Sequence, residues 1–211
     1  MADKTTHAQT THKERTRARI LDEAAMALRQ SGTEGVSVAN LMKRAGLTHG
    51  GFYAHFASRD DLVDHAIGRM FEDSKRMLDR FIGQGANAEG LSALIEYYLA
   101  PQAYRVRDQG CPLPGLSGEA ARMPEAARAR YQAGLQRFRA GIAAALAAMG
   151  KPDPERLAAS VLAEMVGAVS IARSFDAEAE GLAWLDSCRI ALRERLGLGA
   201  PPTPTLSSSR T

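Results

Sequence analysis

The sequence predicts an all-α protein. Alanine, leucine and arginine are abundant and only 6% of the residues are aromatic, a composition that favours helices over sheets. Apolar residues recur every three or four positions through most of the chain, which is the period of helices that bury one face. Glycine and proline fall between these stretches. We therefore expect a short three-helix unit at the N-terminus, followed by a larger helical domain.

Length and charge narrow the classes of protein. The chain of 211 residues, 45% of them hydrophobic and 24% charged, is long enough for a real core and excludes a protein that is disordered throughout. The net charge of +3 lies entirely in residues 1–60, where nine basic residues face six acidic ones (9 − 6 = +3), while the remainder holds 18 of each. A basic front end indicates either a partner that carries phosphates or an ordinary basic tail.

Three helices are predicted within the first 60 residues. Ser31-Gly32 ends the first, Ser37 can cap a brief second helix that stops near Gly46, and Thr48 can cap a third. The first helix carries one apolar stripe, made of Ile20, Leu21, Ala24, Ala25 and Leu28. The turn before the third helix is only three or four residues long, as in domains that hold that helix in the DNA major groove; a plain helical bundle has the same pattern.

The third helix has an unusual composition. Gly50 and Gly51 each cost about 1 kcal/mol relative to alanine in a helix, so stability does not explain them. Bare backbone would allow close approach to base edges or phosphates. Phe52 and Phe56, one turn apart, can anchor the helix to the core, which leaves Tyr53 to project outward.

Further helices follow, interrupted by glycine and proline. Ser58-Arg59-Asp60-Asp61 is typical of a capping box with Asp in place of Glu, and it opens a helix of about twenty residues. A loop is expected from Pro101 to Pro114. The other helical stretches are 91–101, 116–122, 124–149, 157–174 and 182–196.

The stretch from Gly35 to Ile67, GVSVANLMKRAGLTHGGFYAHFASRDDLVDHAI, resembles the DNA-binding domain of the TetR family of transcriptional regulators. The resemblance rests on Leu41–Leu47, Gly50, the pairs Phe52-Tyr53 and His55-Phe56, and Ser58–Leu62. It implies a flexible basic arm (1–12), a helix-turn-helix DNA-binding domain (13–60), a helical ligand-binding and dimerisation domain (61–199) and a disordered tail (200–211). It also implies a homodimer that binds a palindromic double-stranded DNA operator and is released by a small-molecule effector, most simply as a repressor.

The resemblance also implies roles for single residues. Ser37 matches the residue that caps the second helix and touches a phosphate. Bases are read from the positions of Thr48, His49, Gly50 and Gly51, and phosphates are contacted from those of Tyr53, His55 and Arg59; a core tyrosine or a solvated arginine is the plainer alternative. Family members often carry Lys followed by Gly-Thr where this chain has His49-Gly50-Gly51, so its operator sequence cannot be borrowed from a relative. The basic residues near the N-terminus are expected to be solvated charges, and the alternative is charge screening or an arm that enters a DNA groove (Lys13, Arg15, Arg17 and Arg19).

Effector and dimer contacts are predicted in the larger domain. Residues 157–172 are apolar on nearly all sides, and with residues 182–196 they resemble the family's dimer helices. Interface candidates are Val161, Met165, Ala168, Trp184, Leu185, Cys188 and Leu192. Candidates for a pocket that binds a hydrophobic or aromatic effector are Met70, Phe71, Met77, Tyr98, Cys111, Tyr131, Phe138 and Met165, although such stripes are also typical of a core.

Several other classes are disfavoured. We expect no signal peptide or membrane span and a cytoplasmic location, and neither a metal, a cofactor nor a disulfide, since Cys111 and Cys188 form no metal-binding or disulfide pattern. The sequence from Gly115 to Glu119 fails the nucleophile-elbow pattern, so no enzyme is indicated. Two alternatives stay open: a regulator that senses electrophiles or oxidants through Cys111, and a helical protein-binding scaffold.

Overall fold

The computed structural model describes residues 11–83 and 85–199, and this part of the chain consists of α-helices and two 3-10 helices without a strand. The all-α prediction is confirmed. The proposed arm at the N-terminus and the tail from residue 200 lie outside the described residues, except for Thr11 and His12. The elements are α1 (His12–Ser31), α2 (Val38–Arg44), η1 (His49–Ala54), α3 (Arg59–Phe81), α4 (Ala88–Tyr98), α5 (Pro101–Arg105), α6 (Leu113–Leu116), η2 (Ala120–Arg122), α7 (Glu125–Ala148), α8 (Pro154–Ala172) and α9 (Glu178–Leu196).

The helix starts follow from side-chain caps. Thr11 and Glu14 form a capping box, in which the Glu14 amide donates to the Thr11 hydroxyl and the Thr11 amide donates to the Glu14 carboxylate. The Thr11 amide and hydroxyl both donate to the Glu14 carboxylate and lower its pKa. The capping box starts α1 well before its first buried apolar residue, Ile20. The predicted cap at Ser58 is confirmed, because its hydroxyl accepts from the amide of Asp61 at 3.0 Å.

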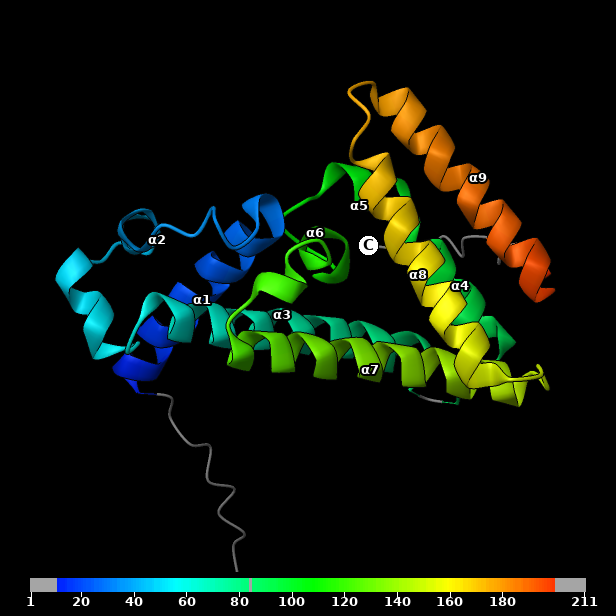
Figure 1. The fold of residues 1–211 in the computed structure, drawn as a ribbon, viewed down its shortest axis with the longest axis horizontal. Coiled ribbons are helices and arrows are strands. Elements are labelled where there is room, and N and C mark those ends of the chain that lie inside the picture. Colours follow the sequence, from blue (N-terminus) through cyan, green and yellow to red (C-terminus); the bar gives the residue numbers. More distant parts are fainter. Residues whose placement is uncertain (1–10, 84, 200–211) are drawn as a thin grey trace, which may run out of the picture.

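Two long helices form the spine of the molecule. Figure 1 shows α3 and α7 side by side along the long axis, with α1, α2 and η1 at one end and α8 and α9 packed together at the other. Because α3 starts directly after η1 and ends among the helices of the larger domain, it joins both halves of the chain. None of the helices in the described residues is long and apolar enough to cross a membrane.

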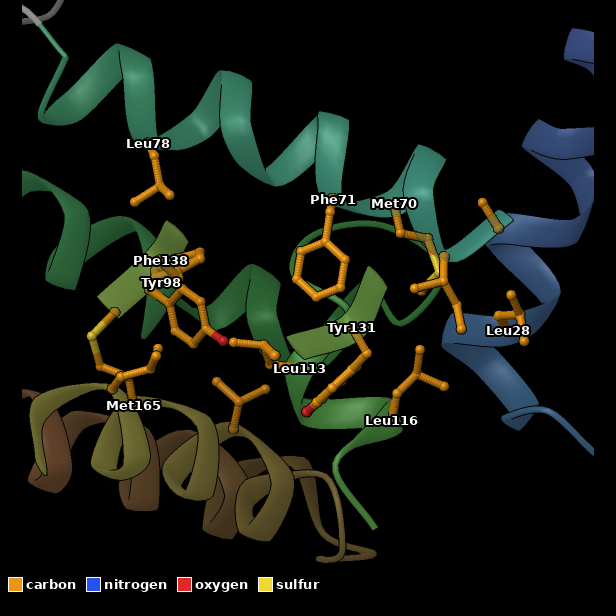
Figure 2. Packing of buried hydrophobic residues seen from close by; sticks show 14 of the residues in the cluster. Leu28, Met70, Phe71, Leu78, Tyr98, Leu113, Leu116, Tyr131, Phe138 and Met165 are labelled. Atoms are coloured by element: carbon orange, nitrogen blue, oxygen red, sulfur yellow. The ribbon is translucent and has the colours of Figure 1, made fainter. Parts of the chain in front are cut away.

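One continuous apolar core links these elements (Figure 2). The ring of Phe71 on α3 meets Tyr131 on α7 edge to face, with centroids 5.9 Å apart. The ring of Tyr98 on α4 meets Phe138 on α7 in the same way and at the same separation. Such pairs add to the free energy of burial, so they fasten α3 and α4 to α7.

The segment from residue 101 to 114 differs from the loop predicted for it. Pro101 begins α5 as its first residue, where a missing amide hydrogen costs nothing, and α6 begins at Leu113. The sequence pattern predicts that Pro101 ends a helix, whereas in the structure it begins one. Likewise α4 begins at Ala88, because the side chain of Asn87 accepts from the amide of Gly90 at 2.8 Å.

Gly134 marks the closest approach between α3 and α7. A Cβ atom at this position would lie 2.2–2.4 Å from ring atoms of Phe71, which is itself buried. Gly141, about two turns further along α7, has room, since its Cβ would lie 3.6 Å from Leu78. The sequence pattern gives no signal that distinguishes these two glycines.

We predict that Gly134→Ala destabilises the protein and that Gly141→Ala does not. Alanine gains about 0.5–1 kcal/mol in a helix interior, but at position 134 this gain is outweighed by overpacking, which costs about 1–3 kcal/mol. Chemical denaturation at a fixed protein concentration measures both free energies of unfolding. Equal stability of the two variants would contradict the close packing described here.

Candidate functional site

The turn between α2 and η1 sets the direction of η1. Gly46 has a φ of +67°, a conformation that glycine adopts without strain. Its amide donates to the carbonyl of Lys43 at 3.0 Å, and the amide of Leu47 donates to that of Met42 at 2.8 Å. The chain therefore reverses within a few residues and enters η1, as the spacing predicted. The element is a 3-10 helix rather than the α-helix expected.

Two buried phenylalanines anchor η1 and leave its other side free. Phe52 and Phe56 are 1% and 2% exposed, and their rings stack with centroids 5.7 Å apart. Tyr53 between them is 68% exposed. A Cβ on Gly50 would meet nothing within 4 Å, and one on Gly51 would make only ordinary contacts. Packing inside the protein therefore does not require either glycine.

Three polar candidates near η1 have exposed side chains. Ser37, Thr48 and His49 are exposed. The Ser37 hydroxyl caps α2 as predicted, accepting from the amide of Asn40 at 3.4 Å. The predicted cap at Thr48 is wrong in one respect, because its hydroxyl makes no capping bond with η1.

Arg59 has a structural role that sequence reasoning missed. Its Nε donates to the carbonyl of Val36 at 3.0 Å, and another guanidinium nitrogen donates to the carbonyl of Thr33. These bonds tie the start of α3 to the loop before α2. About 40% of the side chain remains exposed, so the same arginine holds the loop and still reaches the surface.

The basic residues of α1 are not all solvated charges, which corrects the prediction made for them. The Arg17 guanidinium lies 4.7 Å from the ring centre of Phe56, in a cation–π contact. Arg19 donates to the carbonyl of Ala45 at the end of α2. Both contacts join residues far apart in the sequence, so no local pattern could reveal them. They fix α1 against the elements that position η1.

His55 lies at the end of η1, partly buried beside α1. Its Nδ1 atom is buried and has no hydrogen-bond partner among the described residues. Burial lowers the pKa of His55, and the positive charges of Lys13 and Arg17 lower it further. The imidazole therefore stays neutral near pH 7, where it can donate one hydrogen bond.

The larger domain holds a cavity of about 330 Å³ between α4, α5, the following loop and α8. Of the predicted effector contacts, only Tyr98 and Cys111 line it. The remaining candidates do not line it, because their helical stripes pack against other helices in the core. The cavity is lined by Tyr97, Tyr98, Ala100, Gln102, Ala103, Val106, Gln109, Gly110, Cys111, Pro114, Val169 and Arg173. The candidates placed elsewhere are Met70, Phe71, Met77, Tyr131, Phe138 and Met165.

The predicted dimer contacts also need correction. α8 packs against α7 on one side and α9 on the other, and this explains why its sequence is apolar nearly all round. Five candidates therefore face their own protomer, namely Val161, Met165, Ala168, Leu185 and Leu192. Trp184 remains exposed on α9 and Cys188 is partly exposed, while Ile171 and Ile190 add exposed apolar side chains that sequence analysis did not single out.

Comparison with known proteins finds a family profile that matches the N-terminal part of the chain. Residues 20–66 match the profile of bacterial regulatory proteins, tetR family. An uncharacterized HTH-type transcriptional regulator of Bacillus subtilis (strain 168), YfiR, is 26% identical over 97 residues. That alignment covers 46% of this chain and spans less than half (45%) of the relative's length.

Solved structures share the fold over most of the chain. A TetR transcriptional regulator from Chloroflexus aurantiacus has a TM-score of 0.75 at 22% identity, covering 88% of this chain and 96% of that one. The reduced form of E. coli NemR has a TM-score of 0.74 at 20% identity, covering 90% and 99%. A TetR-family regulator from Agrobacterium tumefaciens has a TM-score of 0.74 at 19% identity, covering 85% and 98%.

The pKa of His55 predicts a specific pH dependence of stability. An unfolded histidine titrates near its ordinary pKa of about 6.5, whereas the folded value is lower. Between pH 6.5 and the folded pKa, the unfolded chain therefore binds more protons at His55 than the folded chain does. The stability present above pH 6.5 is lost as the pH falls through the folded pKa. Between pH 7.5 and 5.5, the melting temperature of the wild type should fall further than that of His55→Gln. His49→Gln, which removes an exposed imidazole from the same element, is the control; parallel pH profiles of wild type and His55→Gln would refute the assignment.

Proposed function

We propose that the protein is a dimeric, ligand-responsive repressor of transcription that binds a palindromic DNA operator. The proposal starts from the match of residues 20–66 to the profile of bacterial regulatory proteins, tetR family. The observation that carries this proposal is the exposed backbone of η1, held from beneath by Phe52 and Phe56. Gly50 has no packing role, and its open surroundings leave the backbone accessible to base edges in the major groove.

The groups around η1 have the chemistry of a phosphate-binding rim. The hydroxyls of Tyr53 and Ser37 and the neutral imidazole of His55 can donate to phosphate oxygens, which fixes the register of the domain on DNA. Lys43 at the end of α2 is exposed and makes no ion pair with the residues that the structure describes. In this proposal His49 contacts bases, because it begins the exposed element.

A second protomer would use the exposed side of α8 and α9. Ile171, Trp184 and Ile190 account for three of the five large, exposed hydrophobic residues in residues 11–83 and 85–199. Gly167 on α8 leaves open space that would allow a partner helix to approach. Two protomers related by a twofold axis present two η1 elements to one duplex, which predicts a palindromic operator.

The cavity and the DNA-binding domain are connected by one segment of chain. The carbonyl of Gly110, a cavity residue, accepts from Nε of Arg29 on α1 at 3.0 Å. Further along, the Glu119 carboxylate accepts from the Thr33 amide at 2.7 Å and from its hydroxyl at 2.6 Å. An effector that moves this segment would therefore shift α1, and it would release DNA if it bound the non-binding arrangement more tightly.

Neither alternative function is favoured by a specific observation. Burial raises the pKa of the Cys111 thiol, which lowers the fraction of reactive thiolate, so a ligand-binding role suits the cavity better than a thiol sensor. A scaffold would not explain the unpacked glycines on η1. Repression by DNA binding also needs no catalytic site, and it places the protein in the cytoplasm with the DNA.

Binding to the DNA upstream of the gene tests the proposal. An inverted-repeat fragment should bind far more tightly than a scrambled fragment, and its affinity should fall steeply with salt as counterions are released. Tyr53→Phe should weaken binding by about tenfold on all operator variants, because it removes one phosphate donor and keeps the ring. Tyr97→Phe, at another exposed tyrosine, is the matched control. Fluorescence anisotropy measures each affinity; equal binding of scrambled DNA would refute the repressor.

Substitution on α8 tests the dimer. Ile171→Glu should weaken self-association by at least tenfold, because it buries a carboxylate in the proposed interface. Ala133→Glu, at an exposed position on α7, should leave the association unchanged. Sedimentation velocity over a range of concentrations measures both. A monomeric wild type, or an Ile171→Glu variant that still forms the dimer, would show that this face is not the interface.

A further inference from the structure

The cavity between α4, α5 and α8 has apolar walls and a mouth bordered by polar side chains. Ala100, Ala103, Val106, Pro114 and Val169 supply the apolar surface, and its volume of about 330 Å³ lies at the lower end of the range for small-molecule sites. Gln102 and Gln109 are exposed and belong to its outer part. These walls suit a compact apolar body such as one aromatic ring system.

One cationic side chain lines this cavity and no carboxylate does. Arg173, at the end of α8, donates from Nε to the carbonyl of Ala103 at 2.8 Å and from a terminal nitrogen to that of Val106 at 3.4 Å. Arg173 forms no ion pair within residues 11–83 and 85–199. Most other partly buried arginines in this part of the chain do form an ion pair with a carboxylate. Arg107 lies close to it and adds positive charge of the same sign.

A buried hydroxyl lies in the same cavity. Tyr98 is 5% exposed, and its hydroxyl has no oxygen or nitrogen partner at hydrogen-bond distance among the described residues; its polar neighbour is the thiol of Cys111, a weak hydrogen-bonding group. Figure 2 shows this hydroxyl turned away from Phe138, towards Leu113. Burial raises the pKa of Tyr98 well above its ordinary value, and the neighbouring Cys111 raises it further, so the phenol keeps its proton and can donate it to an acceptor stronger than a thiol. A buried donor that lacks any acceptor costs about 1–3 kcal/mol.

We propose that this cavity binds a small aromatic or other apolar carboxylic acid, with its carboxylate on Arg173 and the Tyr98 hydroxyl. One carboxylate supplies what both groups lack, because one oxygen accepts from the guanidinium and the other from the phenol. The apolar body of the ligand lies against the walls formed by α5 and α8. This inference deepens the proposed function, on which it rests, by naming the chemical class of the effector.

The arrangement favours an acid over other ligands of the same size. A cation would face Arg173 without a balancing carboxylate in the cavity, and a purely apolar molecule would provide neither a counter-charge for Arg173 nor an oxygen acceptor for Tyr98. The neutral Cys111 thiol adds a weak donor beside Tyr98. An amide of the same shape keeps the apolar contacts but loses the ionic component, and it therefore provides a matched comparison.

Matched pairs of ligands test the inference on the full-length protein. Phenylacetate, 3-phenylpropionate and 1-naphthaleneacetate are compared with their primary amides by isothermal titration calorimetry. At least one acid should bind, and it should bind about tenfold or more tightly than its amide, the difference expected for one charged hydrogen bond. If none of the acids binds, or if the amides bind as tightly, the inference is overturned.

Variants assign the preference to the two groups. Arg173→Gln should abolish the preference for acid over amide, whereas Arg173→Lys, which keeps the charge, should retain part of it. Arg139→Gln, which removes an exposed charge from α7, should leave it unchanged. Tyr98→Phe should weaken acid binding by about fivefold to tenfold, and it tests the site even if Arg173→Gln fails to fold. An Arg173→Gln variant that folds and still prefers the acid would exclude the proposed site.

The inference and the proposed function fail in different ways. Acid binding is measured without DNA, and operator binding is measured without acid. If the acid binds as described but the protein does not bind operator DNA, the proposed repressor function is wrong and the proposed ligand class is retained. If the operator binds but no acid does, the ligand class is wrong and the repressor stands.

Discussion

The burial of Phe52 and Phe56 beneath η1 is the contact on which the rest of the proposed activity depends. A short 3-10 helix with two glycines has little stability of its own, and these two rings hold it against the domain. Because they take up its inner side, Tyr53 must face solvent and the glycine backbone must lie open. The guanidinium of Arg17 covers Phe56 from α1 and completes the anchor. The reading element is thus held by tertiary contacts rather than by helix propensity.

Tertiary contacts also form the connection between the N-terminal helices and the larger domain. α3 leaves η1 directly and packs along α7, where Gly134 allows the two helices to approach closely. The segment from Gly110 to Glu119 borders the cavity at one end and is hydrogen-bonded to α1 and the following turn at both ends. Motion at the cavity therefore has two structural routes to the DNA-binding domain, the long helix and this segment. A bistable packing of these parts would give the coupling that a ligand-dependent repressor needs.

The cavity shows how a site can be recognised by what its residues lack. In most of the molecule, partly buried arginines pair with carboxylates, as Arg29 does with Asp73 and Arg193 with Glu96. Within residues 11–83 and 85–199, Arg173 and Tyr98 differ from these pairs, because Arg173 has no carboxylate partner and the Tyr98 hydroxyl has only the thiol of Cys111 beside it. Both face the same apolar space. Buried polar groups that lack strong partners around one cavity favour the binding of a ligand that supplies those partners.

The sequence by itself determined the all-α class, the tight turn before η1 and the exposed Tyr53, since each depends on local period, caps and spacing. It also indicated the family through residues 35–67. It could not separate core from cavity in the larger domain, because an apolar stripe has the same spacing whether it meets another helix or a ligand. Nor could it show that α8 buries Val161 and Met165 in its own protomer. Only the tertiary structure decided these points, because they depend on which helices meet across long distances in the chain, as does the unpaired charge of Arg173.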